Sequence, residues 1–130
     1  MACGILLLTH PGIGEALLAV AAQLMRPLPL KVEAFAVPFD ADPEQLLPRA
    51  SAAMRRVDEG DGVLLLTDIY GATPSNLATR MARLGTPARR VAALSLPMLM
   101  RVLNYPEQTL EELPATAAAG TRNGAIIDDA

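Results

Sequence analysis

The stretch GILLL at residues 4–8, directly followed by THPG at residues 9–12, is an apolar run that stops at turn residues. Because this run has no polar face, it is typical of a central strand in a parallel sheet, where helices cover both faces. A second run of the same kind, GVLLLT at residues 62–67, ends at Asp68. The two runs predict the buried centre of an α/β fold.

The rest of the chain alternates between the spacing of helices and that of strands. We expect helices over roughly residues 13–25, 43–59, 74–84 and 97–104, and outer strands over residues 31–37 and 91–96. Asp42 and Thr73 each precede a proline, a pair that is typical of an N-cap followed by the first helical residue. In the C-terminal part, TLEE at residues 109–112 has the pattern of a capping box, but Pro114 interrupts the helix that would follow. Residues 125–127 are expected to form a short final strand.

This order of elements predicts one α/β domain over residues 1–130, with a doubly wound, mainly parallel sheet and helices on both of its faces. The expected strand order 2-1-3-4 makes the first and third strands neighbours, and such sheets bind ligands beyond the carboxyl ends of the strands at this switch point. His10 ends the first strand and Asp68 ends the third. Since adjacent strands lie roughly 4.8 Å apart, we expect the two side chains to meet.

The composition narrows the classes of function. The 130 residues suit a single domain, and the hydrophobic content of 52% supports a core without disulfides. The net charge of −3 and the scattered arginines exclude a nucleic-acid binding face. The apolar opening is too short for a signal peptide or a membrane-spanning helix, and the single cysteine, Cys3, indicates a reducing compartment. We therefore expect a cytoplasmic protein that inserts into no membrane and needs no metal ion or cofactor.

The expected pair of His10 and Asp68 suits nucleophilic chemistry. A carboxylate that accepts the Nδ1–H of an imidazole fixes its tautomer and leaves Nε2 free to attack an electrophile. Two helix starts at the same edge offer backbone N–H groups to an anion such as phosphate. The residues expected to bind it are Gly12, Gly14, Gly71, Ala72 and Thr73. On this pattern alone, His10 also fits an ordinary turn residue and Asp68 an ordinary turn cap, since neither G-x-G-x-x-G nor a Walker A sequence occurs.

Three segments carry a resemblance to a known family: ILLLTH at residues 5–10, DIYGATPSN at residues 68–76 and LPML at residues 96–99. Together they resemble the mannose-type EIIA domain of the bacterial phosphoenolpyruvate-dependent sugar phosphotransferase system (PTS). The resemblance implies that His10 is the phosphorylated residue and Asp68 its orienting carboxylate. It also implies that Thr73 and the loop around Gly71 line the phosphoryl site.

Partners are implied by the same resemblance. The phosphocarrier protein HPr would donate the phosphoryl group to His10, and an EIIB component on a separate chain would receive it. A homodimer is implied too, in which residues 125–127 of each chain form a strand on the neighbouring subunit. Two departures concern the expected phosphate loops: Pro11 stands where the family usually has glycine and removes one N–H donor, and Ala72 replaces a second glycine.

The function expected from these observations is that of a sugar-PTS phosphoryl carrier, and thus of a phosphotransferase component. An alternative is a stand-alone regulatory protein, whose phosphorylation at His10 would control its binding to a kinase or a transcription regulator. A third interpretation is the related phosphotransfer subunit of dihydroxyacetone kinase, from which the pattern of residues 71–76 differs. A flavin or nucleotide protein would need a longer phosphate-binding loop.

Overall fold

The computed structural model describes residues 2–129 and contains one four-stranded parallel sheet. The strands are β1 (Gly4–Thr9), β2 (Val32–Ala36), β3 (Val63–Thr67) and β4 (Ala88–Val91), in the spatial order β2-β1-β3-β4. The helices are α1 (Ile13–Leu24), α2 (Pro43–Val57), α3 (Thr73–Met81), α4 (Leu96–Leu103) and α5 (Leu113–Asn123). The predicted α/β fold and the strand order 2-1-3-4 are confirmed.

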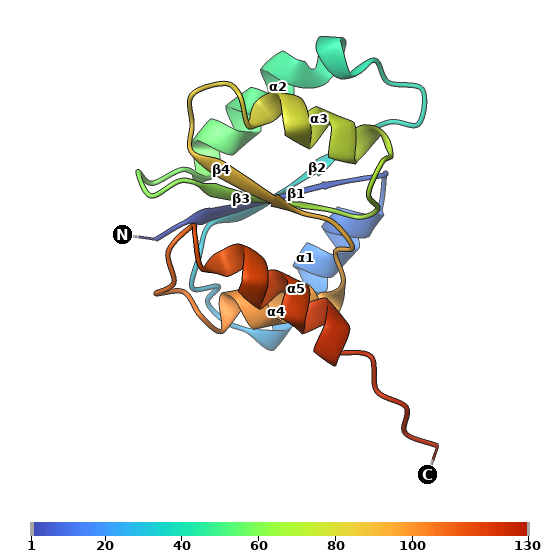
Figure 1. Cartoon of the computed structure of the whole chain (residues 1–130), viewed down its shortest axis with the longest axis vertical. Helices are drawn as coiled ribbons and strands as arrows, with labels where there is room; N and C mark the ends of the chain where they lie inside the picture. The colour runs from blue at the N-terminus through green and yellow to red at the C-terminus, as the bar shows by residue number, and fades with distance from the viewer. Residues whose placement is uncertain (1, 130) are drawn as a thin grey trace.

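Helices cover both faces of the sheet, with α2 and α3 on one side and α1, α4 and α5 on the other (Figure 1). Successive side chains of β1 alternate between these two layers. Ile5 and Leu7 join the core beneath α4 and α5, while Leu6 and Leu8 join the core beneath α2 and α3. Every residue of β1 and β3 is buried, which is why both segments are apolar without alternation.

Two predicted helix starts have different outcomes. Asp42 caps α2 as expected, because its side chain accepts the Glu44 N–H at 3.0 Å and Pro43 stands in the first turn. The N-cap of α3 is Ala72 rather than Thr73, which is the first helical residue and makes no capping bond. Proline is tolerated at either of the first helical positions because N–H groups of the first turn have no acceptor within the helix. The Thr-Pro pair therefore located this start with an error of one residue.

The fourth strand lies earlier than expected, at residues 88–91 instead of 91–96. It pairs only with β3 and forms an edge of the sheet, so the side chains of Arg89 and Arg90 remain exposed. An edge strand accommodates charged residues that a central strand excludes. The chain then turns, and Ser95 caps α4 by accepting the Met98 N–H at 3.1 Å.

The C-terminal part corrects two further predictions. Thr109 and Glu112 do exchange capping-box bonds, but they form a turn ahead of α5, and Pro114 lies in the first turn of that helix instead of interrupting it. Residues 125–127 form no strand in this chain, since the described segment after α5 runs away from the sheet and has no strand beside it (Figure 1). Pairing of this segment with a second subunit stays a prediction.

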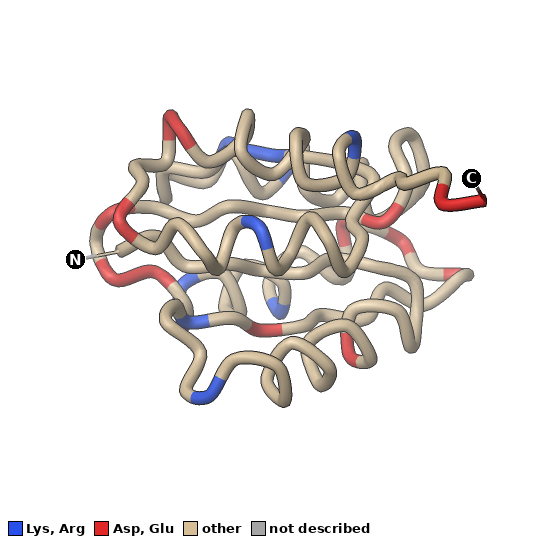
Figure 2. Tube along the Cα trace, turned by 90° about the horizontal axis from the view of Figure 1, so that it is seen from below, with Lys and Arg blue, Asp and Glu red and all other residues tan. Residues whose placement is uncertain are grey.

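Figure 2 shows Lys and Arg spread over several elements rather than gathered on one face, while several Asp and Glu lie in loops near the N-terminus. Within residues 2–129 no helix is both long and apolar enough to cross a membrane.

The alternation in β1 generates a stability prediction. Leu7 is fully buried, so Leu7→Ala is expected to lower the free energy of unfolding by about 2–5 kcal/mol through lost contacts and a cavity. Leu24, at the end of α1, is 61% exposed and serves as the matched control, since Leu24→Ala should change that free energy by about 0.5 kcal/mol or less. Urea unfolding followed by circular dichroism measures both, and equal losses would contradict the assignment of Leu7 to the core.

Candidate functional site

The site forms where β1 and β3 end beside each other. Their parallel register pairs Leu8 with Thr67, so the next residues of each strand leave the sheet at the same edge. There Nδ1 of His10 lies 2.7 Å from Oδ2 of Asp68. The backbone N–H of His10 donates to the same oxygen at 2.9 Å. The predicted contact between His10 and Asp68 is confirmed.

Both carboxylate oxygens of Asp68 accept hydrogen bonds. Its side chain is only 8% exposed, and its second oxygen, Oδ1, accepts the N–H of Ile69 at 3.1 Å. A carboxylate only accepts hydrogen bonds, so the neutral imidazole of His10 must carry its proton on Nδ1. Nε2 then keeps its lone pair, and no hydrogen bond within residues 2–129 occupies it. The His10 side chain is 22% exposed, so part of the imidazole reaches the protein surface.

The start of α1 differs from the expectation that Gly12 and Gly14 bind an anion. The Gly14 N–H donates to Oγ1 of Thr9 at 2.9 Å, in a buried contact, and the Gly12 N–H donates to Oε2 of Glu15 at 3.2 Å. Both donors are therefore already used within the chain. Gly14 serves close packing instead, because a Cβ there would lie 3.1 Å from the Thr9 hydroxyl. Glu15 was not among the sequence predictions, although Glu at the third helical position is a known capping signal.

The loop before α3 is more open. Gly71 has φ of +88°, a left-handed conformation that favours glycine, and a Cβ there would meet nothing within 4 Å. Within the described chain, the N–H groups of Gly71 and Thr73 and the Thr73 hydroxyl have no hydrogen-bond partner. They belong to the loop that follows Asp68 and to the N-terminal turn of α3, where the helix dipole also favours an anion. Of the five expected anion-binding residues, Gly71 and Ala72 thus lie in the loop and Thr73 at the first helical position of α3, where N–H donors remain free within the described chain.

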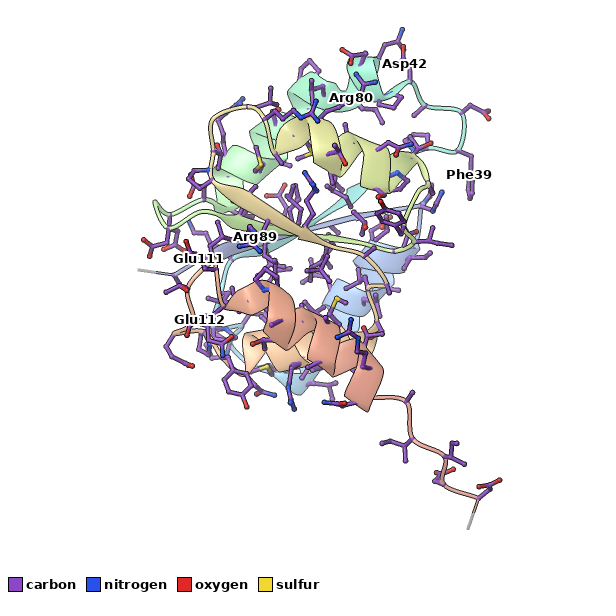
Figure 3. All side chains as sticks on the ribbon, in the orientation of Figure 1. Phe39, Asp42, Arg80, Arg89, Glu111 and Glu112 are labelled. Atoms are coloured by element: carbon purple, nitrogen blue, oxygen red, sulfur yellow. The ribbon has the colours of Figure 1, made fainter. Side chains whose placement is uncertain are left out.

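An aromatic neighbour of His10 was not predicted. The ring of Phe39, which follows β2, stacks on the imidazole with 5.1 Å between the ring centroids and 27° between the planes. Figure 3 shows Phe39 extending from the loop between β2 and α2. The only sequence signal was its place just after a strand that ends at this edge. Phe39, Ile69 and Tyr70 are 76%, 58% and 85% exposed, and together they form what we call the apolar rim of the site.

Cys3 lies at the opposite edge of the sheet, just before β1. Its side chain is buried, and its thiol donates to the backbone carbonyl of Asp61 at 3.4 Å. Burial raises the pKa of the Cys3 thiol, and the carboxylates of Asp61 and Asp58 raise it further. A protonated thiol is a poor nucleophile, so Cys3 remains a structural residue. Among residues 2–129 no group of three or more His, Cys, Asp or Glu side chains is placed to hold a metal ion.

Comparisons with known proteins identify the family of the chain. A family model described as PTS system fructose IIA component (EIIA-man) matches residues 4–118 of the chain. The PTS system mannose-specific EIIAB component of Escherichia coli (strain K12) is 30% identical over 83 residues, which cover 62% of this chain and 26% of that protein. The chain therefore spans about a quarter of the length of the curated relatives that it matches.

Solved structures show the same fold. The mannose/sorbose specific IIA subunit of the phosphotransferase system from Enterococcus faecalis superposes with a TM-score of 0.84 at 23% sequence identity, covering 100% of this chain and 97% of that one. The phosphotransferase system component EIIA from Streptococcus agalactiae superposes with a TM-score of 0.79 at 18% identity, covering 96% of each chain.

The hydrogen bonds around His10 predict a single tautomer. In the neutral wild-type protein we expect the proton on Nδ1, and in Asp68→Ala we expect this preference to be lost because its acceptor is gone. The ¹⁵N chemical shifts of the two ring nitrogens measure the tautomer, and they need no assignment because His10 is the only histidine. Asp61→Ala, at the opposite edge, is the control. A wild-type ring protonated mainly on Nε2 would contradict the prediction.

Proposed function

The chain belongs to the EIIA-man family of the phosphotransferase system, and from that premise we propose that it is a phosphoryl carrier that uses His10. The observation that carries the proposal is the contact of 2.7 Å between Nδ1 of His10 and Asp68, which leaves Nε2 as the free nucleophile of a partly exposed imidazole. The position of this pair at the switch point of a parallel sheet also supports it, because such edges commonly bind ligands.

The proposed step is a phosphoryl transfer between two nitrogen atoms. The lone pair of Nε2 attacks the phosphorus in line with the bond to the donor, a new N–P bond forms, and the donor nitrogen leaves with the electron pair of the broken bond. The His10 ring gains positive charge as the bond forms. The Asp68 carboxylate, bonded to Nδ1–H, compensates this charge and keeps the ring in the attacking orientation.

Donors for the phosphoryl oxygens are proposed in the loop before α3. Gly71 and Thr73 supply backbone N–H groups without a partner in the described chain, Thr73 adds a hydroxyl, and Ala72 is the N-cap between them. A helix N-terminus with free N–H groups favours a phosphoryl anion. Gly12 and Gly14 enter the proposal only as neighbours of the site, since their N–H groups are bonded to Glu15 and Thr9.

The partners proposed for His10 are proteins: HPr as the donor and an EIIB component on a separate chain as the acceptor, in the cytoplasm. The apolar rim supports this, because exposed apolar side chains around a reactive group are typical of a protein contact. A homodimer is proposed as well, and the exposed side chains of Ile126 and Ile127 give the segment 125–127 apolar groups for a neighbouring subunit. The regulatory alternative would use the same phosphorylation and the same rim.

Phosphorylation of His10 is tested by labelling. Incubation with phosphoenolpyruvate, enzyme I and HPr should yield a phosphate that is labile in acid and stable in base, and phosphorus–nitrogen coupling should locate it on Nε2. His10→Ala is expected to remain unlabelled, with circular dichroism confirming that it is folded. Labelling of His10→Ala at the wild-type level would refute the proposal.

The orienting role of Asp68 predicts a slower transfer in Asp68→Asn. The amide keeps the size of the side chain but removes the charge, and a hydrogen bond to a charged group is worth about 1.5–3 kcal/mol, which corresponds to a loss of rate of about ten- to a hundredfold. Rapid-quench measurement of transfer from phosphorylated HPr gives the rate. Asp61→Asn, outside the site, should transfer as fast as wild type, and equal rates for Asp68→Asn and wild type would exclude the orienting role.

A further inference from the structure

Phe39 occupies a turn that is fixed at both ends. Before it, the Val37 N–H donates to the carbonyl of Thr9 at 2.8 Å, which ties the end of β2 to the end of β1. After it, the Ala41 N–H donates to the carbonyl of Pro38 at 3.1 Å, which closes the turn around Phe39. The cap at Asp42 then starts α2. These backbone bonds place the ring of Phe39 over His10, which directly follows Thr9.

The contacts of Phe39 differ from those of a core residue. Its side chain is 76% exposed, so burial explains little of its presence. Phe35, the other phenylalanine, packs against the core beneath α2 and α3. Ile69 and Tyr70 share the exposure of Phe39 at this edge. Phe39 is the rim residue that stacks on the imidazole.

We propose that Phe39 is a positioning residue for phosphoryl transfer at His10; this inference rests on the proposed function. Asp68 holds the imidazole through one atom, Nδ1, so the plane of the ring can still tilt about that hydrogen bond. The stacked phenyl ring closes one face and restricts that tilt, which keeps Nε2 directed outward. As Nε2 bonds to phosphorus the imidazole becomes positive, and the negative face of the phenyl ring attracts that charge.

The first arm of the test measures the stack without any phosphoryl transfer. Proton NMR of the two ring C–H groups of His10 should show a ring-current shift in wild type and in Phe39→Tyr, and its loss in Phe39→Leu. The signals are unambiguous because His10 is the only histidine. Tyr105→Leu removes an aromatic ring outside the site and should leave the shifts unchanged. Identical His10 shifts in Phe39→Leu and wild type would overturn the proposal.

The second arm separates positioning from partner docking. In Phe39→Leu, the maximal single-turnover rate of transfer from phosphorylated HPr should fall about two- to fivefold, the rate equivalent of an exposed cation–π contact. The HPr concentration at half-maximal rate should stay unchanged, and Phe39→Tyr should restore the rate. A change confined to that concentration would overturn positioning and assign Phe39 to docking. If wild type accepts no phosphoryl group, the proposed function fails, whereas the NMR arm still decides whether Phe39 holds the ring.

Discussion

The parallel pairing of β1 with β3 is the constraint on which the site depends. Both strands are buried on both faces, so a shift of their register by one residue would move every side chain of a strand into the opposite layer of the core. The apolar packing that stabilises the domain therefore also fixes which residues leave the sheet together. His10 and Asp68 meet because of that register, and their contact of 2.7 Å needs no contribution from a flexible segment.

The two helix starts at this edge play different roles. The α1 start is closed to an anion, since the side chains of Thr9 at the end of β1 and Glu15 in α1 accept the N–H groups of Gly14 and Gly12. The α3 start follows a glycine with positive φ and leaves donors free beside Asp68. The edge thus has a closed helix start at α1 and, after Asp68, an open one at α3 with spare positive potential for an anion. This asymmetry is consistent with Pro11, whose missing N–H lies on the closed side.

The sequence allowed the central strands, the strand order and the contact of His10 with Asp68 to be predicted, because these depend on continuous apolar runs and on topology. The limits of β4 were wrong because the edge strand carries Arg89 and Arg90, which its exposure permits. The use of the Gly12 N–H depended on which rotamer Glu15 adopts, and the position of Phe39 depended on a turn closed by backbone bonds. The spacing of apolar residues carries no information on a side-chain rotamer or on a turn, so the sequence could not predict the bonded state of the Gly12 N–H or the position of Phe39.

A carrier has to give up its phosphoryl group as readily as it accepts it. A hydrogen-bond donor that stabilises the phosphorylated state more than the transition state raises the barrier to the next transfer and slows it. An open site suits this requirement: the imidazole is partly exposed, the N–H groups of Gly12 and Gly14 are bonded elsewhere, and the free donors proposed for the phosphoryl group lie in the loop before α3 and at the first residue of that helix. Asp68 and Phe39 contact the ring, so in the proposed transfer they act on the ring rather than on the phosphoryl oxygens. In that transfer they stabilise the positive charge that the imidazole gains as the N–P bond forms, and they hold the ring in the same orientation for acceptance and for release.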